Sequence, residues 1–434
     1  MSDVLQGEVG AVQVETVRQD STRPLAIGAV LVALFLASLQ LAALVWKFPG
    51  PGPSIWNDLF GRPKSSSLPW AALILATVGL TRVRRLQALA TAAVLDGVGV
   101  ALRVWSDTAL TVGNGPSLVL LGLGVYAIHR HRVGAPDSLR ALRGVALGAL
   151  LLLATKAGDA WLHITMVTRP RVLDEYAHAA DQALGNPSWV MGSILERLGP
   201  IPDGVLHWIY IQLPVAAIVV ALYQLRGVAS GAAWPRHFLF RTFLLIGLVG
   251  PIFYLLFPVV GPVFAFEGWP HPGAATGSPS EFTFDSSVPR NCMPSLHTAW
   301  ALSIFIHSRR GPWWLRTGGT LWLLGTLAAT LGFGYHYGVD LVAGAVLCLT
   351  LESILRDPER GWDRARITLV AYGSAAMAAL LLSYRYLAAE FASQPLVFGP
   401  LVLGILVAMA CGFYATFFAD PTRVTDRIRS VPSR

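Results

Sequence analysis

Long apolar runs without charged side chains constrain this sequence more than any other feature. A helix rises about 1.5 Å per residue, so about 20 apolar residues cross a hydrocarbon core of about 30 Å. Seven runs contain no Asp, Glu, Lys or Arg: Leu25–Trp46, Thr108–Ile128, Gly204–Leu225, Thr242–Phe257, Thr317–Tyr335, Ile367–Tyr384 and Pro395–Phe418. Five more are shorter or carry a charge: Ser65–Thr81, Leu86–Leu102, Gly144–Thr168, Pro294–Ser308 and Tyr337–Leu355. We therefore predict an all-α polytopic membrane protein with about twelve transmembrane helices.

The composition supports this fold class. Hydrophobic residues make up 54% of the 434 residues and charged residues only 13%, whereas a soluble domain averages about 25% charged residues. A cytosolic enzyme and a disordered chain are thereby excluded. The net charge of +8 is spread over single or paired basic residues between apolar runs, so we expect no nucleic-acid partner.

The basic residues also predict the orientation in the membrane. Most of the 33 Lys and Arg residues fall in alternate loops, beginning with the N-terminal segment. Cytoplasmic loops carry such an excess. We expect a protein of the cytoplasmic or plasma membrane with both termini in the cytoplasm.

Two long segments then face the extracytoplasmic side. Arg169–Asp203 contains an amphipathic stretch, Trp189–Leu198, which we expect to lie along the membrane surface. Pro258–Met293 is rich in Gly, Pro and aromatic residues, and a loop of this length is usually functional. It is predicted to be a lid or a substrate entrance, with a plain connector as the alternative.

Three titratable side chains lie at the outer ends of adjacent predicted spans: His297, His336 and Asp340. His336 and Asp340 are four residues apart, so on a helix they share one face. The carboxylate can then orient the imidazole and strengthen its other nitrogen as a nucleophile or base. Together with His297, this arrangement favours an active site over a structural histidine.

The segment before His297 supplies groups that suit a phosphate. Arg290 is the one Lys or Arg between Thr242 and Ser308, and its guanidinium matches phosphate oxygens. Ser295 stands where a helix begins, so its hydroxyl and the free backbone N–H groups can receive an anion. These residues predict a phosphoryl-transfer site that needs no metal.

At these positions the sequence resembles the type 2 phosphatidic acid phosphatase superfamily. Pro294-Ser295-Leu296-His297, followed 39 residues later by His336-Tyr337-Gly338-Val339-Asp340, is similar to its second and third signatures. The forms PSLH and HYxxD are most similar to the branch of inositolphosphotransferases and inositol phosphorylceramide synthases. The resemblance implies that His336 forms a phosphohistidine, Asp340 orients it, His297 protonates the leaving oxygen, and Ser295 and Arg290 hold the phosphate. It also implies a core of six helices, no metal and no cofactor.

Two departures from the phosphatase branch favour the transferase-like branch. Thr330 stands six residues before His336, where that branch has an Arg, and the segment Leu256–Val263 has the prolines of the first signature without its cations. The missing positive charge could come from Lys156, Arg169, Arg171 or Arg197.

The predicted organisation has five parts. They are a cytoplasmic tail (1–24), an accessory four-helix transmembrane region (25–134), the phosphatase-like catalytic core (141–360), two C-terminal transmembrane helices (366–418) and a second cytoplasmic tail (419–434).

The expected activity transfers a phosphoryl or phospho-headgroup from a membrane lipid on the outer leaflet to a polyol or a lipid alcohol. A lipid-phosphate phosphatase with water as the acceptor is the first alternative. A twelve-span transporter with Asp96, Lys156 and Asp159 as coupling charges, a two-histidine, one-carboxylate metal site, and a lipid-binding scaffold without catalysis are the others.

Overall fold

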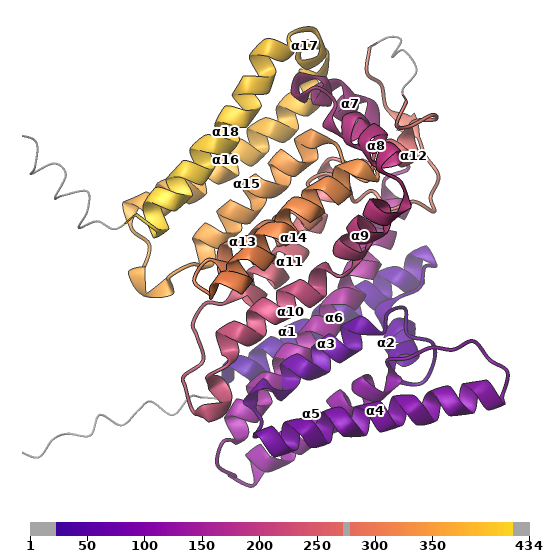
Figure 1. Ribbon diagram of the computed structural model, residues 1–434, viewed down its shortest axis with the longest axis vertical. Helices are drawn as coiled ribbons and strands as arrows, with labels where there is room; N and C mark the ends of the chain where they lie inside the picture. The colour runs from indigo at the N-terminus through magenta and orange to yellow at the C-terminus, as the bar shows by residue number, and fades with distance from the viewer. Residues whose placement is uncertain (1–22, 272–277, 420–434) are drawn as a thin grey trace, which may run out of the picture.

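The computed structural model describes residues 23–271 and 278–419. These residues form an all-α molecule apart from one two-stranded sheet, so the predicted fold class is confirmed. Almost all of the predicted tails, 1–24 and 419–434, lies outside the described residues. Figure 1 shows the N-terminal helices as one body beneath the core, with the C-terminal helices on the opposite flank.

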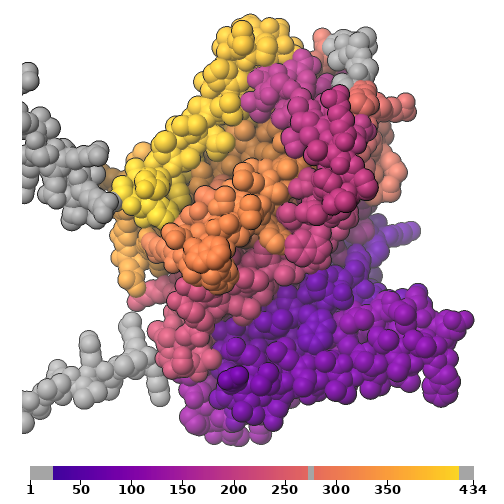
Figure 2. Space-filling model, viewed as in Figure 1, coloured from indigo at the N-terminus to yellow at the C-terminus, as the bar shows by residue number. Residues whose placement is uncertain are grey.

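The N-terminal body consists of six helices: α1 (Arg23–Trp46), α2 (Pro51–Leu59), α3 (Ser67–Ala76), α4 (Arg82–Trp105), α5 (Asn114–Arg132) and α6 (Ser138–Thr168). α3 packs against α5 and α6 around a core of small and branched apolar side chains. The space-filling view in Figure 2 shows this body in broad contact with the rest of the chain. α6 makes much of that contact through α11.

The central body contains the helices that carry the predicted site: α9 (Pro200–Ile211), α10 (Leu213–Leu225), α11 (Leu239–Leu256), α13 (Leu296–Ser308), α14 (Trp313–Gly332) and α15 (Gly338–Leu355). α15 lies between α13, α11 and α16, and almost every residue along it is buried. The C-terminal helices are α16 (Arg364–Tyr386), α17 (Ala388–Ser393) and α18 (Pro395–Phe417). α16 and α18 cover the outer side of α15.

All twelve predicted spans fall on helices, but they differ in their capacity to cross a membrane. Eight described helices are long and apolar enough to do so. The runs Ser65–Thr81, Thr108–Ile128, Pro294–Ser308 and Thr317–Tyr335 form shorter or less apolar helices. Two boundaries were wrong. α5 begins only at Asn114, and the run Gly204–Leu225 breaks at Gln212 because Pro214 has no N–H to continue the helix.

Short elements from the two long predicted loops cover one end of the core. They are strands β1 (Arg171–Val172) and β2 (Phe282–Thr283), which pair antiparallel, and helices α7 (Asp174–Asp181), α8 (Pro187–Leu198) and α12 (Pro262–Ala265). The described residues also contain four single 3-10 turns: Thr77–Gly79, Gln182–Leu184, Val228–Ser230 and Pro358–Arg360. The predicted amphipathic stretch is helix α8, which buries Trp189 and Leu195 against the core and exposes Val190, Ile194 and Leu198.

The charged residues inside the N-terminal body have partners that their sequence spacing did not suggest. Lys156 pairs with Asp58 at 2.5 Å in a buried site, and Asp159 pairs with Lys64 at 2.8 Å. Lys156 and Asp159 therefore do not pair with each other, although they lie three residues apart in α6. Asp96 accepts hydrogen bonds from the backbone of residues 113 and 115 and from an indole N–H.

Candidate active site

The predicted site is built where α13 and α15 both begin. Ser295 is the N-cap of α13, and its backbone N–H donates to the carbonyl of Asp340 in the first turn of α15 at 3.1 Å. Gly344 allows this approach, since a Cβ there would lie 2.3 Å from the Ser295 carbonyl oxygen. The two signature segments are thus locked together by main-chain contact.

His336 lies immediately before α15, and its surroundings determine which ring nitrogen is protonated. Its Nδ1 lies 2.9 Å from the carbonyl oxygen of Cys292 and 3.4 Å from Oδ2 of Asp340. A carbonyl can only accept, so Nδ1 carries the proton and Nε2 keeps a free lone pair. Burial lowers the pKa of His336 to about 4, which keeps the imidazole neutral near pH 7.

Asp340 is fully buried, and its carboxylate contacts both the start of its own helix and the imidazole of His336. Its Oδ2 accepts the backbone N–H of Tyr337 at 2.9 Å and the thiol of Cys292. The four-residue spacing therefore does place the carboxylate beside the imidazole, as expected. The closest protein acceptor of the imidazole N–H is nevertheless the Cys292 carbonyl.

His297 projects from the first turn of α13 toward the same place. Its ring centroid lies 6.2 Å from that of His336, and its ring stacks on Tyr210 of α9 at 3.9 Å. Tyr210 in turn contacts Tyr335, which stacks on the half-exposed Phe264. His297 thus lies at the inner end of an aromatic path, while His336 lies deeper.

Ser295 keeps the position that the sequence predicts. Its hydroxyl oxygen accepts from the backbone N–H and the hydroxyl of Thr298, so its own proton is free to donate. The N–H groups of Leu296 and His297 have no acceptor among the described residues. The first turn of α13 therefore offers three donors to an anion.

The contacts of Arg290 do not favour the predicted phosphate-binding role. Its guanidinium is buried and donates to the backbone carbonyls of Arg169 at 2.9 Å, Asp285 at 2.7 Å and Phe284 at 3.0 Å, and also to that of Val288. Irregular backbone leaves such carbonyls unpaired, and a buried Arg can satisfy several at once. Arg290 fastens the segment around β2 to the end of α6.

The four cations proposed to compensate for the missing charge divide into two pairs. Lys156 is held by Asp58, and Arg171 lies 3.9 Å from Glu281 across β1 and β2. The side chains of Arg169 and Arg197 are exposed.

Two aspartates that we did not predict hold the start of α15 in place. Asp174 and Asp181 lie seven residues apart in α7, hence on one face of it, and both are fully buried. Asp174 accepts the Tyr337 hydroxyl at 2.9 Å and the backbone N–H groups of Val260 and Gly261. Asp181 accepts the N–H of Val339 at 3.0 Å, in the first turn of α15. The seven-residue spacing was the signal available in the sequence.

Cys292, His336 and Asp340 also place three possible metal-ligand atoms within 4.8 Å of one another. The observed hydrogen bonds do not suit a metal. Nδ1 of His336 carries the proton that it donates to the Cys292 carbonyl, and burial raises the pKa of the Cys292 thiol. A metal would need the lone pair of that nitrogen and the thiolate form of the cysteine. The alternative metal site expected from His297, His336 and Asp340 does not form as such a group among the described residues.

Comparison with protein families agrees with this geometry. Residues 190–353 match the family model described as the PAP2 superfamily, and residues 24–164 match one described as a domain of unknown function, DUF5933. The first range contains all five predicted site residues; the second covers α1 to α5 and most of α6. No curated protein and no solved structure matched the chain. Within an all-α membrane fold, residues 190–353 are therefore similar to the PAP2 superfamily, which supports a lipid phosphatase or phosphotransferase activity.

Proposed function

We propose that this protein is a lipid phosphotransferase whose covalent intermediate is a phosphohistidine at Nε2 of His336. The observation that carries the proposal is the hydrogen bond from Nδ1 of His336 to the Cys292 carbonyl. It leaves the lone pair of Nε2 free, and the imidazole of His297 lies across from it. A neutral imidazole with a fixed tautomer is the form that attacks phosphorus.

Each group has one task in the proposed reaction. The Nε2 lone pair of His336 attacks phosphorus while the bond from phosphorus to the leaving oxygen breaks, and His297 gives that oxygen a proton. An acceptor hydroxyl then gives its proton to His297 and attacks phosphorus, which releases His336. Asp340 and the Cys292 carbonyl hold the Nδ1–H throughout, and the chain needs no metal for either step.

The phosphate is held at the first turn of α13 in this proposal. The Ser295 hydroxyl and the N–H groups of Leu296 and His297 supply the donors, supported by the partial positive charge of a helix N-terminus. Arg290 contributes by fastening the neighbouring loop rather than by touching phosphate. Arg169 and Arg197, whose side chains are exposed, are the two proposed cations left to supply further positive charge.

We infer that the acceptor is an alcohol, as in the inositolphosphotransferase-like branch, because Thr330 and the segment Leu256–Val263 lack the cations of the phosphatase branch. Hydrolysis is the second candidate, and the burial of His336, which is only 3% exposed, favours it because water is the smallest acceptor. The substrate enters along Tyr210, Tyr335 and Phe264, aromatic side chains that suit the headgroup layer of a lipid.

The proposed site faces the extracytoplasmic side. Arg309, Arg310 and Arg316 join α13 to α14 at the opposite end of the core from His336. An excess of basic residues marks the cytoplasmic end of a membrane protein. Both termini are cytoplasmic in this orientation.

A transporter is less well supported. The coupling charges that it would need, Asp96, Lys156 and Asp159, each have a fixed partner within the N-terminal body. Mobile coupling ions require groups that change partners, and a buried pair such as Lys156 with Asp58 opposes such a change because an isolated charge there is costly.

The test uses purified protein in nanodiscs that contain lipids labelled with radioactive phosphorus. Free phosphate and new phosphodiester lipids are measured together, with inositol or a lipid alcohol added as the acceptor. We expect alcohol-dependent transfer and a labelled protein whose phosphate is stable to base and lost in acid, as for phosphohistidine.

His336→Asn is the variant of choice because its side-chain amide can still donate to the Cys292 carbonyl. It should lose both the label and all turnover, whereas His271→Asn, at an exposed histidine paired with Glu196, should keep both. Turnover by His336→Asn would refute the mechanism. Release of free phosphate with no transfer to any alcohol would replace the transferase by a phosphatase.

A further inference from the structure

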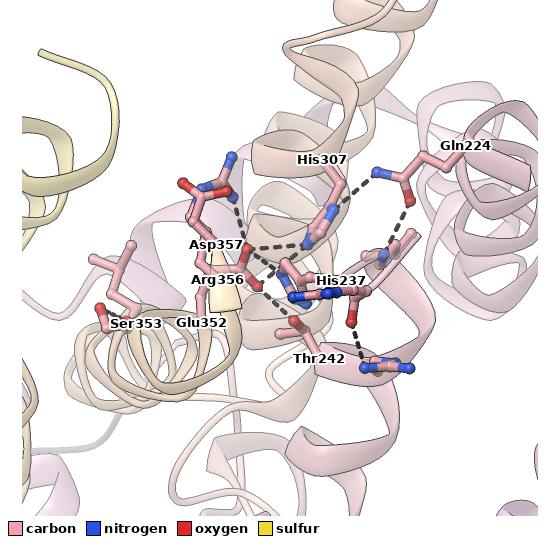
Figure 3. Close-up of polar contacts among 12 residues, drawn as sticks. Gln224, His237, Thr242, His307, Glu352, Ser353, Arg356 and Asp357 are labelled. Carbon is pink, nitrogen blue, oxygen red and sulfur yellow. Dashed lines mark hydrogen bonds and ion pairs between the residues drawn. The ribbon is translucent and has the colours of Figure 1, made fainter. Parts of the chain in front are cut away.

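A second polar cluster lies at the other end of the core, around Glu352 near the end of α15. Glu352 follows Asp340 by twelve residues, so the two lie about 18 Å apart along the helix. Its buried carboxylate accepts from Nε2 of His237 at 3.0 Å, Nε2 of His307 at 3.1 Å, Nη1 of Arg356 at 2.7 Å and Oγ1 of Thr242 at 2.5 Å. Figure 3 shows these donors converging on the carboxylate. Thr242 belongs to α11 and His307 to α13, whereas Arg356 follows α15 and His237 precedes α11.

The neighbouring amide determines how this cluster is protonated. Gln224 accepts the N–H of Leu239 through Oε1 at 2.9 Å, so its Nε2 is the atom that donates to Nδ1 of His307 at 3.0 Å. Nδ1 therefore carries the lone pair, and Nε2–H donates to Glu352. His237, His307 and Glu352 do place three ligand atoms within 4.8 Å, but this tautomer directs a proton, not a lone pair, at the place a metal would occupy.

A cavity of about 330 Å³ adjoins the cluster, and Arg236, Arg310 and Arg356 are among the residues that line it. Arg356 uses Nη1 on Glu352 and stacks on Phe418. Arg236 and Arg310 form only loose ion pairs: Arg236 lies 3.7 Å from Glu359, and Arg310 lies 4.0 Å from Asp357. These separations are too long for hydrogen bonds.

Most of the forked donors of Arg236 and Arg310 are therefore free for a ligand. The negative charge of Glu352 is already balanced by Arg356 and the three other donors. The two acids at the rim, Asp357 and Glu359, are on exposed side chains that can turn away when an anion enters.

We propose that this cavity binds a phosphate group, carried by an anionic lipid of the leaflet opposite the active site or free in solution. Guanidinium groups match phosphate oxygens in pairs, and basic pockets between membrane helices bind anionic headgroups. Trp313, Trp314 and Trp362 are exposed at the same end of the core, as expected for the headgroup layer. This site is separate from the phosphoryl-transfer site at His336 and does not depend on it.

The test measures thermal unfolding of the full-length protein in phosphatidylcholine nanodiscs. One series adds increasing fractions of phosphatidylglycerol, and a second adds inorganic phosphate at constant ionic strength. The variant R236Q/R310Q removes two cavity guanidinium groups. R316Q/R364Q is its control, because it removes two exposed arginines from the same end of the core, outside the cavity.

We expect the concentration that half-saturates the stabilisation to rise about thirtyfold in R236Q/R310Q, since one basic residue near a membrane surface contributes about fivefold in affinity. The control should change far less. A response to the lipid alone identifies a headgroup phosphate, and a response to inorganic phosphate identifies a soluble ligand; either supports the site. Equal responses in the two double variants, or one equivalent of zinc bound by the purified protein, would overturn it.

Discussion

Replacing Asp174 by Asn tests how this buried carboxyl stabilises the protein at the active site. Burial raises the pKa of this carboxyl from 3.8 to about 7, although the N–H groups of Gly261 and Val260 and the Tyr337 hydroxyl oppose the rise. Between pH 4 and pH 7 the folded protein then holds a proton on Asp174 that the unfolded chain has lost. The stability contributed by this group is complete below pH 4 and decreases as the pH rises, by about 1.4 kcal/mol per pH unit and about 4 kcal/mol in all.

Asparagine removes this pH dependence but keeps the hydrogen bonds. All three donors, the Tyr337 hydroxyl and the N–H groups of Val260 and Gly261, lie within 3.2 Å of Oδ1 of Asp174, so a single amide oxygen can accept them. Leucine would leave all three buried donors without an acceptor, at about 1–3 kcal/mol each. We therefore expect Asp174→Leu to be strongly destabilised at every pH.

The assay is thermal unfolding of wild type, Asp174→Asn and Asp174→Leu in the same detergent, from pH 4.5 to pH 8. The difference between wild type and Asp174→Asn cancels the titration of every other group. It should move in favour of the variant as the pH rises and level off above about pH 7. A difference that stays constant with pH, or that moves in favour of wild type, would refute the reasoning about Asp174.

Three further outcomes follow from the structure. Because burial lowers the pKa of His336 to about 4, the acidic limb of kcat/KM for lipid should begin only below about pH 4 and fall tenfold per pH unit there; an acidic limb that begins near pH 6.5, with the fold intact by circular dichroism, would contradict this assignment. Lys156→Met should destabilise the protein by about 3–5 kcal/mol by leaving Asp58 charged and buried, and K156M/D58L should recover most of the loss in the same melting assay. Arg290→Lys should lower the melting temperature and speed proteolysis near β2, because an ammonium cannot reach four carbonyls; an unchanged cleavage rate would rule out the fastening role.

The sequence predicted those parts of the molecule that depend on neighbouring residues. Apolar runs predicted where helices form, because such runs must be buried in lipid or protein, so every predicted run falls on a helix even where its boundary was wrong. The spacing of His336 and Asp340 predicted their contact because both belong to one turn of chain. The start of α13 at Ser295 was equally local, since a hydroxyl residue before an apolar run is a common N-cap.

Contacts between distant segments could not be predicted in this way. Lys156 pairs with Asp58, and Asp174 accepts the hydroxyl of Tyr337, although the two partners lie far apart in the sequence in each case. Arg290 looked available because the sequence does not show how many carbonyls the surrounding loop leaves unpaired. Once the loop folds, those carbonyl oxygens accept the N–H groups of the guanidinium.

The two helix starts at the site differ in a way that explains how a phosphate can bind without Arg290. The first N–H groups of α15 are taken by carboxylates, since Tyr337 donates to Asp340 and Val339 to Asp181. An anion at the start of α15 would find no free donors, and Asp340 and Asp181 would repel it. The first N–H groups of α13 are open. We infer that phosphate binds at the start of α13 and that His336 attacks it from the α15 side. The start of α15, with its two aspartates, then positions the nucleophile, and the start of α13, with its open N–H groups, binds the phosphate.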